Sequence, residues 1–102
     1  MPAERHSIEY LDDGLYFVIR PRLESGRQCF DVLGGSVVDG AKIVQHPCHR
    51  HYNQQWSAWS PRGGQFNIRN RKSGKCIQRE RNGSLLEMPC NQRDGRQRFK
   101  LN

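Results

Sequence analysis

Four residues that could ligate a metal ion lie close together in the middle of the chain: His46, Cys48, His49 and His51. Imidazole nitrogens and thiolate sulfurs are ligands that Zn²⁺ prefers in proteins. Neighbouring side chains of an extended segment point to opposite sides, however, and Cys48 has another role that is described below. We therefore expect no metal site and no cofactor, and we interpret His49, Arg50 and His51 as an exposed loop.

The four cysteines indicate how so small a chain is stabilised. Only 34% of the 102 residues are hydrophobic, so the core is thin and covalent staples are expected. An even number of cysteines in a short chain, without a Cys-x-x-Cys pair, is typical of disulfides formed in an oxidising compartment. No apolar run matches a signal peptide or a membrane span. A mature secreted form and a cytosolic protein with free thiols both stay open, and we favour the secreted, extracellular form.

Short runs of β-forming residues alternate with turn signals along the whole chain. Asn82-Gly83 is typical of a two-residue hairpin turn, and Ser25-Gly26, Asp39-Gly40 and Ser73-Gly74 are further turn signals. No segment has a convincing helical period. The pattern predicts an all-β fold with eight short strands, at residues 15–19, 29–33, 41–45, 55–59, 65–69, 75–79, 84–88 and 98–101.

The second half of the chain repeats the landmarks of the first half in the same order. Phe17-x-Ile19-Arg20 matches Phe66-x-Ile68-Arg69, and His46-Pro47-Cys48 matches Met88-Pro89-Cys90. A repeat of this kind indicates a duplicated structural unit. The simplest disulfide pairing then lies within each copy, although four cysteines allow three pairings. These within-copy pairs are Cys29 with Cys48 and Cys76 with Cys90.

Several of these motifs resemble one repeat of the ricin B-type lectins. They are Cys29-Phe30-Asp31-Val32, Pro47-Cys48 and Asn53-Gln54-Gln55-Trp56, and the last contains the Gln-x-Trp hallmark of that family. Gln97-Arg98-Phe99 resembles a degenerate form of the hallmark. The resemblance covers residues 14–102 and implies a β-trefoil, which has three four-stranded repeats.

Only two repeats are visible in this sequence, at about 14–60 and about 65–102, after an N-terminal segment at 1–13. An incomplete trefoil leaves sheet edges and an apolar face open, and such surfaces favour association. Three explanations stay open: a longer parent or partner protein supplies the third repeat, the chain forms a homo-oligomer, or the first thirteen residues cover the gap.

The resemblance also implies a sugar site in the first repeat. It assigns Asp31 as the acceptor for sugar hydroxyls, His46 as the ring that stacks on the sugar, Asn53 as a second polar contact and Gln54 as a brace for Asp31. The second repeat has Gln78 and Met88 at the corresponding positions, so we expect no sugar site there. The function predicted in this way is a non-catalytic, galactose- or N-acetylgalactosamine-binding lectin module.

Two other classes of function stay open as alternatives. The chain could be a protein-interaction or assembly subunit on a lectin scaffold. It could also bind a polyanion such as heparin, because the formal charge is +7, although nucleic acid is not favoured since few aromatic residues interleave with the cations. The basic run that would do so is Arg62, Arg69, Arg71, Lys72, Lys75, Arg79 and Arg81. No enzyme activity is expected, because no Gly-x-Ser-x-Gly motif or converging carboxylate pair is present.

Overall fold

Antiparallel β-strands make up the regular structure of the protein. The computed structural model describes residues 6–21 and 27–100. The strands are β1 (His6–Tyr10), β2 (Phe17–Pro21), β3 (Gln28–Val32), β4 (Lys42–Pro47), β5 (Trp56–Arg62), β6 (Gln65–Asn70), β7 (Cys76–Arg79) and β8 (Leu85–Met88). Three short 3₁₀ turns lie between strands: η1 (Leu33–Gly35), η2 (Tyr52–Gln54) and η3 (Gly95–Gln97). The predicted all-β fold is confirmed. In the described part of the chain, no helix is long and apolar enough to cross a membrane.

The two differences from the predicted strands lie near the ends of the chain. β1, which forms a hairpin with β2, was not predicted because it is mostly exposed and its apolar pattern is weak: of Ser7–Tyr10, Ile8 alone is partly buried. The run at 98–101 was predicted as a strand, but within the described residues it contributes one bridge, between Phe66 and Phe99. The Arg98 guanidinium binds the carbonyls of Ser60 and Gln65 beside that bridge. The predicted turn at Ser25-Gly26 lies outside the described residues.

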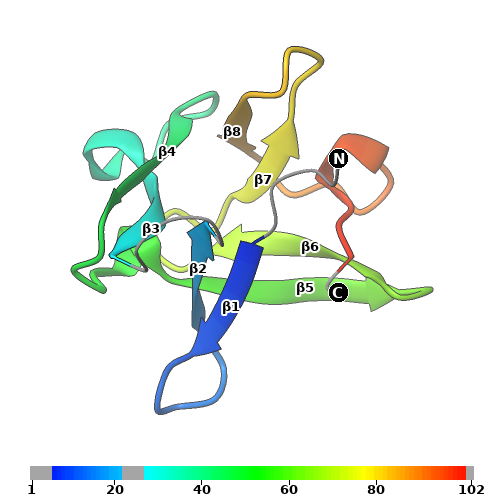
Figure 1. Ribbon diagram of the computed structural model, residues 1–102. Coiled ribbons are helices and arrows are strands. Elements are labelled where there is room, and N and C mark those ends of the chain that lie inside the picture. Colours follow the sequence, from blue (N-terminus) through cyan, green and yellow to red (C-terminus); the bar gives the residue numbers. More distant parts are fainter. Residues whose placement is uncertain (1–5, 22–26, 101–102) are drawn as a thin grey trace, which may run out of the picture.

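The strands form one curled sheet in the order β1-β2-β5-β6-β7-β8-β4-β3. Each copy contributes a hairpin that stands away from the long β5–β6 hairpin, β3–β4 from the first copy and β7–β8 from the second (Figure 1). The two hairpins also pair with each other, since Ile43 on β4 lies opposite Leu85 on β8. The sheet therefore joins the two copies into one unit.

The register shows that β1 and β2 are arranged like β5 and β6. Ser7 lies opposite Arg20 in the first pair, and Ser57 lies opposite Arg69 in the second. β5 is the last strand of the first copy and pairs with β6, the first strand of the second copy. β1 pairs with β2 in the same way, so it takes the place of the last strand of a further repeat. The sheet includes part of the segment at 1–13 that the sequence analysis set apart, and the boundaries of the two repeats stay a prediction.

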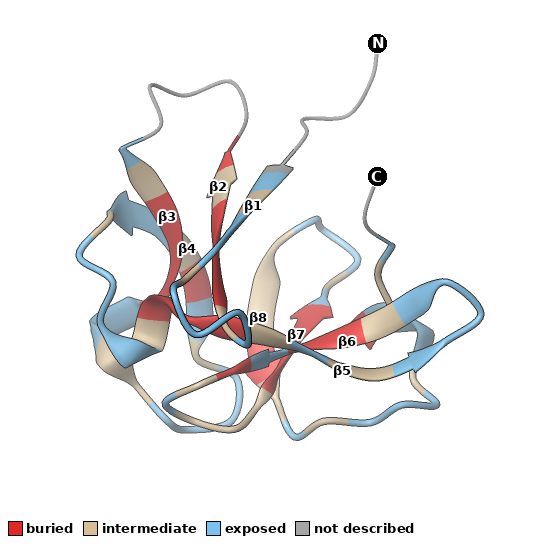
Figure 2. Ribbon diagram, turned by 90° about the horizontal axis from the view of Figure 1, so that it is seen from below, coloured by how far each residue is buried: buried red, intermediate tan, exposed pale blue. Residues whose placement is uncertain are grey.

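The hydrophobic core lies where the two copies meet (Figure 2). Trp56, from the Gln-x-Trp motif, is completely buried, and its indole Nε1 donates to the carbonyl oxygen of Phe30 at 3.4 Å. Phe17 is also completely buried. Phe99, at the matching position of the second copy, is only partly buried and packs against this core under the Arg79 guanidinium. The tryptophan of the Gln-x-Trp motif is therefore a core residue.

Two disulfides staple the hairpins, and both follow the predicted pairing within each copy. Cys29 on β3 is bonded to Cys48 just after β4, and Cys76 on β7 is bonded to Cys90 just after β8. Loops of this length contribute about 3 kcal/mol each on the chain-entropy model. That is a large share of the stability of a domain of this size.

Glu87 is a fully buried carboxyl group between the two copies. Its Oε1 accepts a hydrogen bond from the Ser73 hydroxyl at 2.7 Å, whereas Oε2 has no hydrogen-bond partner among the described residues. Burial raises the pKa of Glu87 above its ordinary value of 4.5, and the Ser73 hydrogen bond and the charge of Lys75 only partly oppose this effect. The folded protein therefore binds this proton more tightly than the unfolded chain does.

The raised pKa of Glu87 predicts a pH dependence of stability. The folded state gains stability from the protonated carboxyl below about pH 4.5 and loses it as the pH rises through the folded pKa. Glu87→Gln removes this titration, so the free energy of unfolding of the wild type should fall relative to the variant as the pH rises from 4 to 8. Urea titrations of both proteins across this range measure the difference. If the difference in unfolding free energy between the two proteins stays constant, or if the wild type becomes relatively more stable as the pH rises, the raised pKa of Glu87 is contradicted.

Candidate functional site

A buried carboxylate on β3 is the centre of the candidate site. Asp31 is only 4% exposed, and its side chain points toward the loop between β4 and β5. Oδ1 accepts a hydrogen bond from Asn53 Nδ2 at 3.1 Å, and Oδ2 accepts one from Gln54 Nε2 at 2.8 Å. Asn53 and Gln54 both belong to η2, which lies within this loop. Two amide donors thus hold the carboxylate in one orientation.

Gln54 also links this carboxylate to the segment between β4 and η2. Its Nε2 also donates to the carbonyl oxygen of Pro47 at 3.0 Å. Its Oε1 accepts from the backbone N–H groups of His49 and Arg50 at 2.9 and 3.1 Å. These N–H groups converge because Arg50 has a φ of 64°, in the left-handed region that few non-glycine residues adopt. Every donor and acceptor position of the completely buried Gln54 amide is therefore used.

The second copy repeats this brace without the carboxylate. Gln97 Nε2 donates to the carbonyl oxygen of Pro89 at 3.0 Å, as Gln54 does to Pro47, and its Oε1 accepts from the backbone N–H of Asn91 at 2.8 Å. The other acceptor of Gln97 Nε2 is Gln78 Oε1 at 3.1 Å, at the position of Asp31. The brace is thus common to both copies, whereas the negative charge is specific to the first copy.

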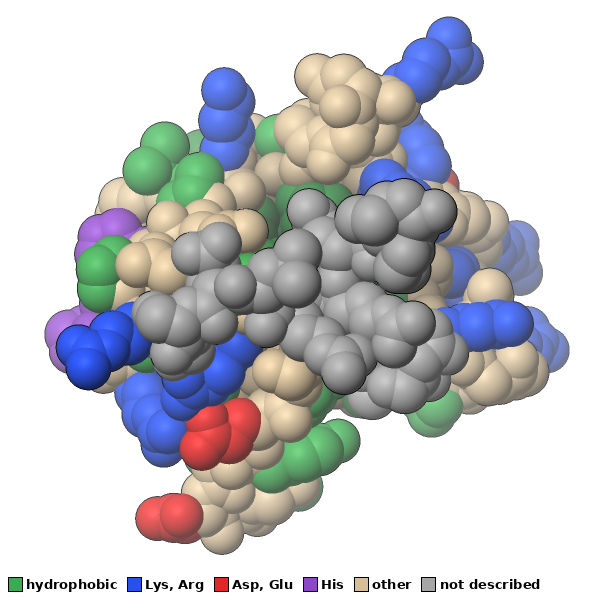
Figure 3. Space-filling view, viewed as in Figure 1, with side chains coloured by type: hydrophobic (Ala, Val, Ile, Leu, Met, Phe, Trp, Pro, Cys, Tyr) green, Lys and Arg blue, Asp and Glu red, His purple; other side chains and the backbone are tan. Residues whose placement is uncertain are grey.

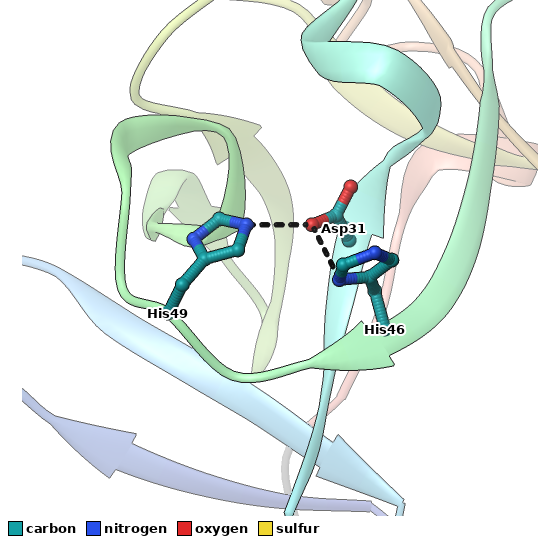
Figure 4. Close-up of side chains that lie close together, drawn as sticks. All are labelled: Asp31, His46 and His49. Atoms are coloured by element: carbon teal, nitrogen blue, oxygen red, sulfur yellow. Dashed lines mark ion pairs between the residues drawn. The ribbon is translucent and has the colours of Figure 1, made fainter.

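Two histidines approach the same oxygen of Asp31 from the loop and from β4 (Figure 4). His49 Nε2 lies 3.3 Å from Oδ2, and His46 Nδ1 lies 4.0 Å from it. The side chains of His46 and His49 are 54% and 32% exposed, against 5% for that of Asp31. A cluster with a buried anion at its base and two exposed rings at its mouth can accept hydrogen bonds, stack on an apolar surface or ligate a cation.

His49 is the member of this cluster that the sequence analysis missed, because it was interpreted as part of an exposed loop. The disulfide explains its position. Cys29 lies two residues before Asp31 and Cys48 one residue before His49, so the bond between them brings Asp31 and His49 together. The predicted pairing of these cysteines was the signal that could have placed His49 beside Asp31.

The hydrogen bonds leave Asp31 part of its acceptor capacity. Each carboxylate oxygen has about two acceptor positions. Oδ2 is close to Gln54 and to His49, whereas Oδ1 accepts a side-chain bond from Asn53 and from no other described residue. Oδ1 therefore keeps an acceptor position that no described side chain uses.

The predicted polyanion-binding residues are largely engaged within the molecule. The Arg71 guanidinium lies 4.1 Å from the ring centroids of both Tyr16 and Tyr52, and Lys75 Nζ lies 3.5 Å from a carboxylate oxygen of Asp39. Lys and Arg side chains are spread around the rim of the visible face and do not form one continuous patch on it (Figure 3). The other predicted members are Arg62, Arg69, Lys72, Arg79 and Arg81, of which Arg69 and Lys72 bind backbone carbonyl oxygens.

Superposition on solved structures defines the fold class of the protein. A chain of a designed threefold-symmetric protein, ThreeFoil, superposes with a TM-score of 0.82 at 25% identity, over 93% of this chain and 69% of that one. An exo-β-1,3-galactanase from Clostridium thermocellum gives 0.80 at 27% identity, over 94% of this chain and 21% of that one. A chain of the PSL1a–E64 complex superposes with a TM-score of 0.73 at 18% identity, over 90% of this chain and 31% of that one. These likenesses identify the fold as a β-trefoil, of which this chain has about two thirds.

The family follows from the sequence itself. A family model described as ricin-type β-trefoil lectin domain-like matches residues 3–100, so the chain belongs to that family and the predicted resemblance is confirmed. No curated protein sequence matches the chain. A lectin-like domain indicates carbohydrate binding in general.

The duplicated brace predicts that Gln54 and Gln97 matter equally for stability. Alanine at either position leaves several partly buried backbone groups without partners, so each variant should lose about 2–3 kcal/mol of unfolding free energy. The exposed Gln45 is the matched control, and Gln45→Ala should change stability by less than about 0.5 kcal/mol. Urea denaturation measures all three variants. Loss in only one of the two brace variants would show that the copies are not equivalent in this respect.

Proposed function

We propose that this chain is a non-catalytic carbohydrate-binding module whose first repeat binds glycans of the galactose or N-acetylgalactosamine type. The observation that carries the proposal is the Asp31 carboxylate, which is buried, held by the amides of Asn53 and Gln54, and still able to accept hydrogen bonds. Membership of a lectin-like family supports carbohydrate as the ligand class. The likeness to an exo-β-1,3-galactanase supports a galactose-type sugar.

Each of the four predicted residues then has a distinct role. Asp31 accepts hydrogen bonds from two adjacent sugar hydroxyls, which a single fixed carboxylate can do. Asn53 contacts a further hydroxyl, and Gln54 keeps Asp31 oriented without touching the sugar. His46, which is half exposed beside Asp31, stacks on the C–H face of the ring. Its imidazole is smaller than the indole of a tryptophan, so this stacking contributes less.

The second repeat is proposed to have a structural role only. Gln78 lies at the position of Asp31, and its Nε2 is already bonded to Glu80 Oε2 at 2.9 Å. A neutral amide with its own partners offers a sugar less than a carboxylate does. The proposal therefore gives one sugar site to each chain.

A single site of this kind binds weakly, so useful avidity requires several copies. The sheet order supports association, because β1 and β3 are its end strands and open strand edges pair readily with other strands. We therefore propose that the module works as a homo-oligomer or within a larger assembly. The two disulfides support an oxidising, extracellular location.

The proposal predicts that Asp31→Ala abolishes or weakens galactose binding at least tenfold, because the variant loses the central acceptor. Gln78→Ala is the matched control in the second copy and should bind like the wild type. Titration calorimetry with N-acetylgalactosamine, in buffer containing EDTA, measures the three affinities. Circular dichroism confirms that each variant is folded. Equal binding by the wild type and Asp31→Ala, or equal loss in Gln78→Ala, would overturn the proposal.

A further inference from the structure

We propose that Asp31, His46 and His49 also form a binding site for a divalent transition-metal ion, with Zn²⁺ as the ion that fits best. Each of the three residues offers one ligand atom, and these atoms all lie within 4.8 Å of one another (Figure 4). Two imidazoles and one carboxylate are a ligand set that suits zinc. Metal binding at this site does not require a saccharide, so it can be tested independently of the proposed function.

The distances between the ligand atoms are close to those of a zinc site. Zn–N and Zn–O bonds of about 2.0–2.2 Å place the ligand atoms of a tetrahedral ion about 3.3 Å apart. His49 Nε2 and Asp31 Oδ2 are already at 3.3 Å, and His46 Nδ1 is at 4.0 Å from the same oxygen. Because His46 is half exposed, rotation of its side chain can close the remaining distance.

The anchor of the site is rigid before any ion binds. Asn53 and Gln54 hold the Asp31 carboxylate by hydrogen bonds, as outer partners do in metal sites of known proteins. The disulfide between Cys29 and Cys48 fixes the backbone on both sides of the cluster. Only the His46 and His49 side chains have to move when the ion binds, so binding costs little conformational entropy.

Local changes at both histidines accompany binding. His49 Nδ1 accepts a hydrogen bond from the backbone N–H of His51 at 3.0 Å, so in the neutral ring the proton lies on Nε2, which faces Asp31. Ligation through Nε2 moves that proton to Nδ1 and breaks this bond. Because His51 is exposed, its N–H can turn to water. His46 Nδ1 lies 3.3 Å from the carbonyl oxygen of Pro47, and ligation through Nδ1 gives up this exposed contact as well. The cost is therefore two exposed contacts.

This site differs from the zinc site that the sequence analysis considered and set aside. That set needed Cys48, which the disulfide removes as a ligand. Asp31 replaces it, from a strand that is far away in the sequence but adjacent in the sheet. The second copy has Gln78, Met88 and Asn91 at the three corresponding positions, so it offers no equivalent set. We therefore expect one ion per chain.

Titration calorimetry with ZnCl₂ tests this inference, using untagged, disulfide-intact full chain freed of metal by EDTA and dialysis, without sugar. The wild type should bind one Zn²⁺ per chain with a micromolar dissociation constant. His46→Ala and His49→Ala should each weaken binding at least tenfold. His51→Ala is the matched control, since this exposed neighbour supplies no ligand atom, and its affinity should stay within threefold of the wild type.

A second measurement keeps the test independent of folding defects. Thermal melts in EDTA should be similar for the wild type and the histidine variants, and added Zn²⁺ should raise the melting temperature of the wild type and of His51→Ala only. Absence of zinc binding up to 1 mM, or binding that His46→Ala and His49→Ala leave unchanged, would overturn the metal site. Neither result would affect the galactose titration in EDTA, so the two proposals fail separately.

Discussion

The side-chain amide of Gln54 is the interaction on which the first copy depends. It joins the Asp31 carboxylate, the Pro47 carbonyl oxygen and the N–H groups of His49 and Arg50 at one buried point. A buried amide with unmade hydrogen bonds is costly, so the loop has few alternatives to this arrangement. The same contacts that close the loop therefore also fix the carboxylate at the centre of the candidate site.

Duplication explains why the two copies look alike and yet differ in chemistry. Gln97 closes the second loop in a similar way: it donates to the Pro89 carbonyl oxygen and accepts from the backbone N–H of Asn91, while its second acceptor position takes the Asn67 side-chain amide. The residue facing the brace can vary as long as it offers an acceptor, and both Asp31 and Gln78 do so. Folding thus tolerates either residue at this position, whereas the proposed sugar recognition requires the carboxylate. In this protein, stability is shared between the copies and recognition is proposed for one.

The fold could be predicted from the sequence because its signals are local and repeated. Turn residues, β-forming runs and paired cysteines occur twice in the same order, which was enough to find β2 to β8 and both disulfides. β1 was missed because, although it forms a hairpin with β2, it is mostly exposed and its apolar pattern is weak. His49 was missed for a different reason: the predicted Cys29–Cys48 pairing brings its neighbourhood near Asp31, but its approach to the carboxylate also depends on the path of the loop around Gln54. Local pattern does not encode such paths.

The central claim is that the first copy's clamped carboxylate is the point of sugar recognition. Side-chain amide signals of Asn53, Gln54 and Gln97 in a ¹⁵N–¹H correlation spectrum report on the two copies at once. On titration with N-acetylgalactosamine in EDTA, the Asn53 and Gln54 signals should shift together along one binding curve, while those of Gln97 stay in place. Shifts confined to Gln97, or no shift at any of the three, would contradict the claim.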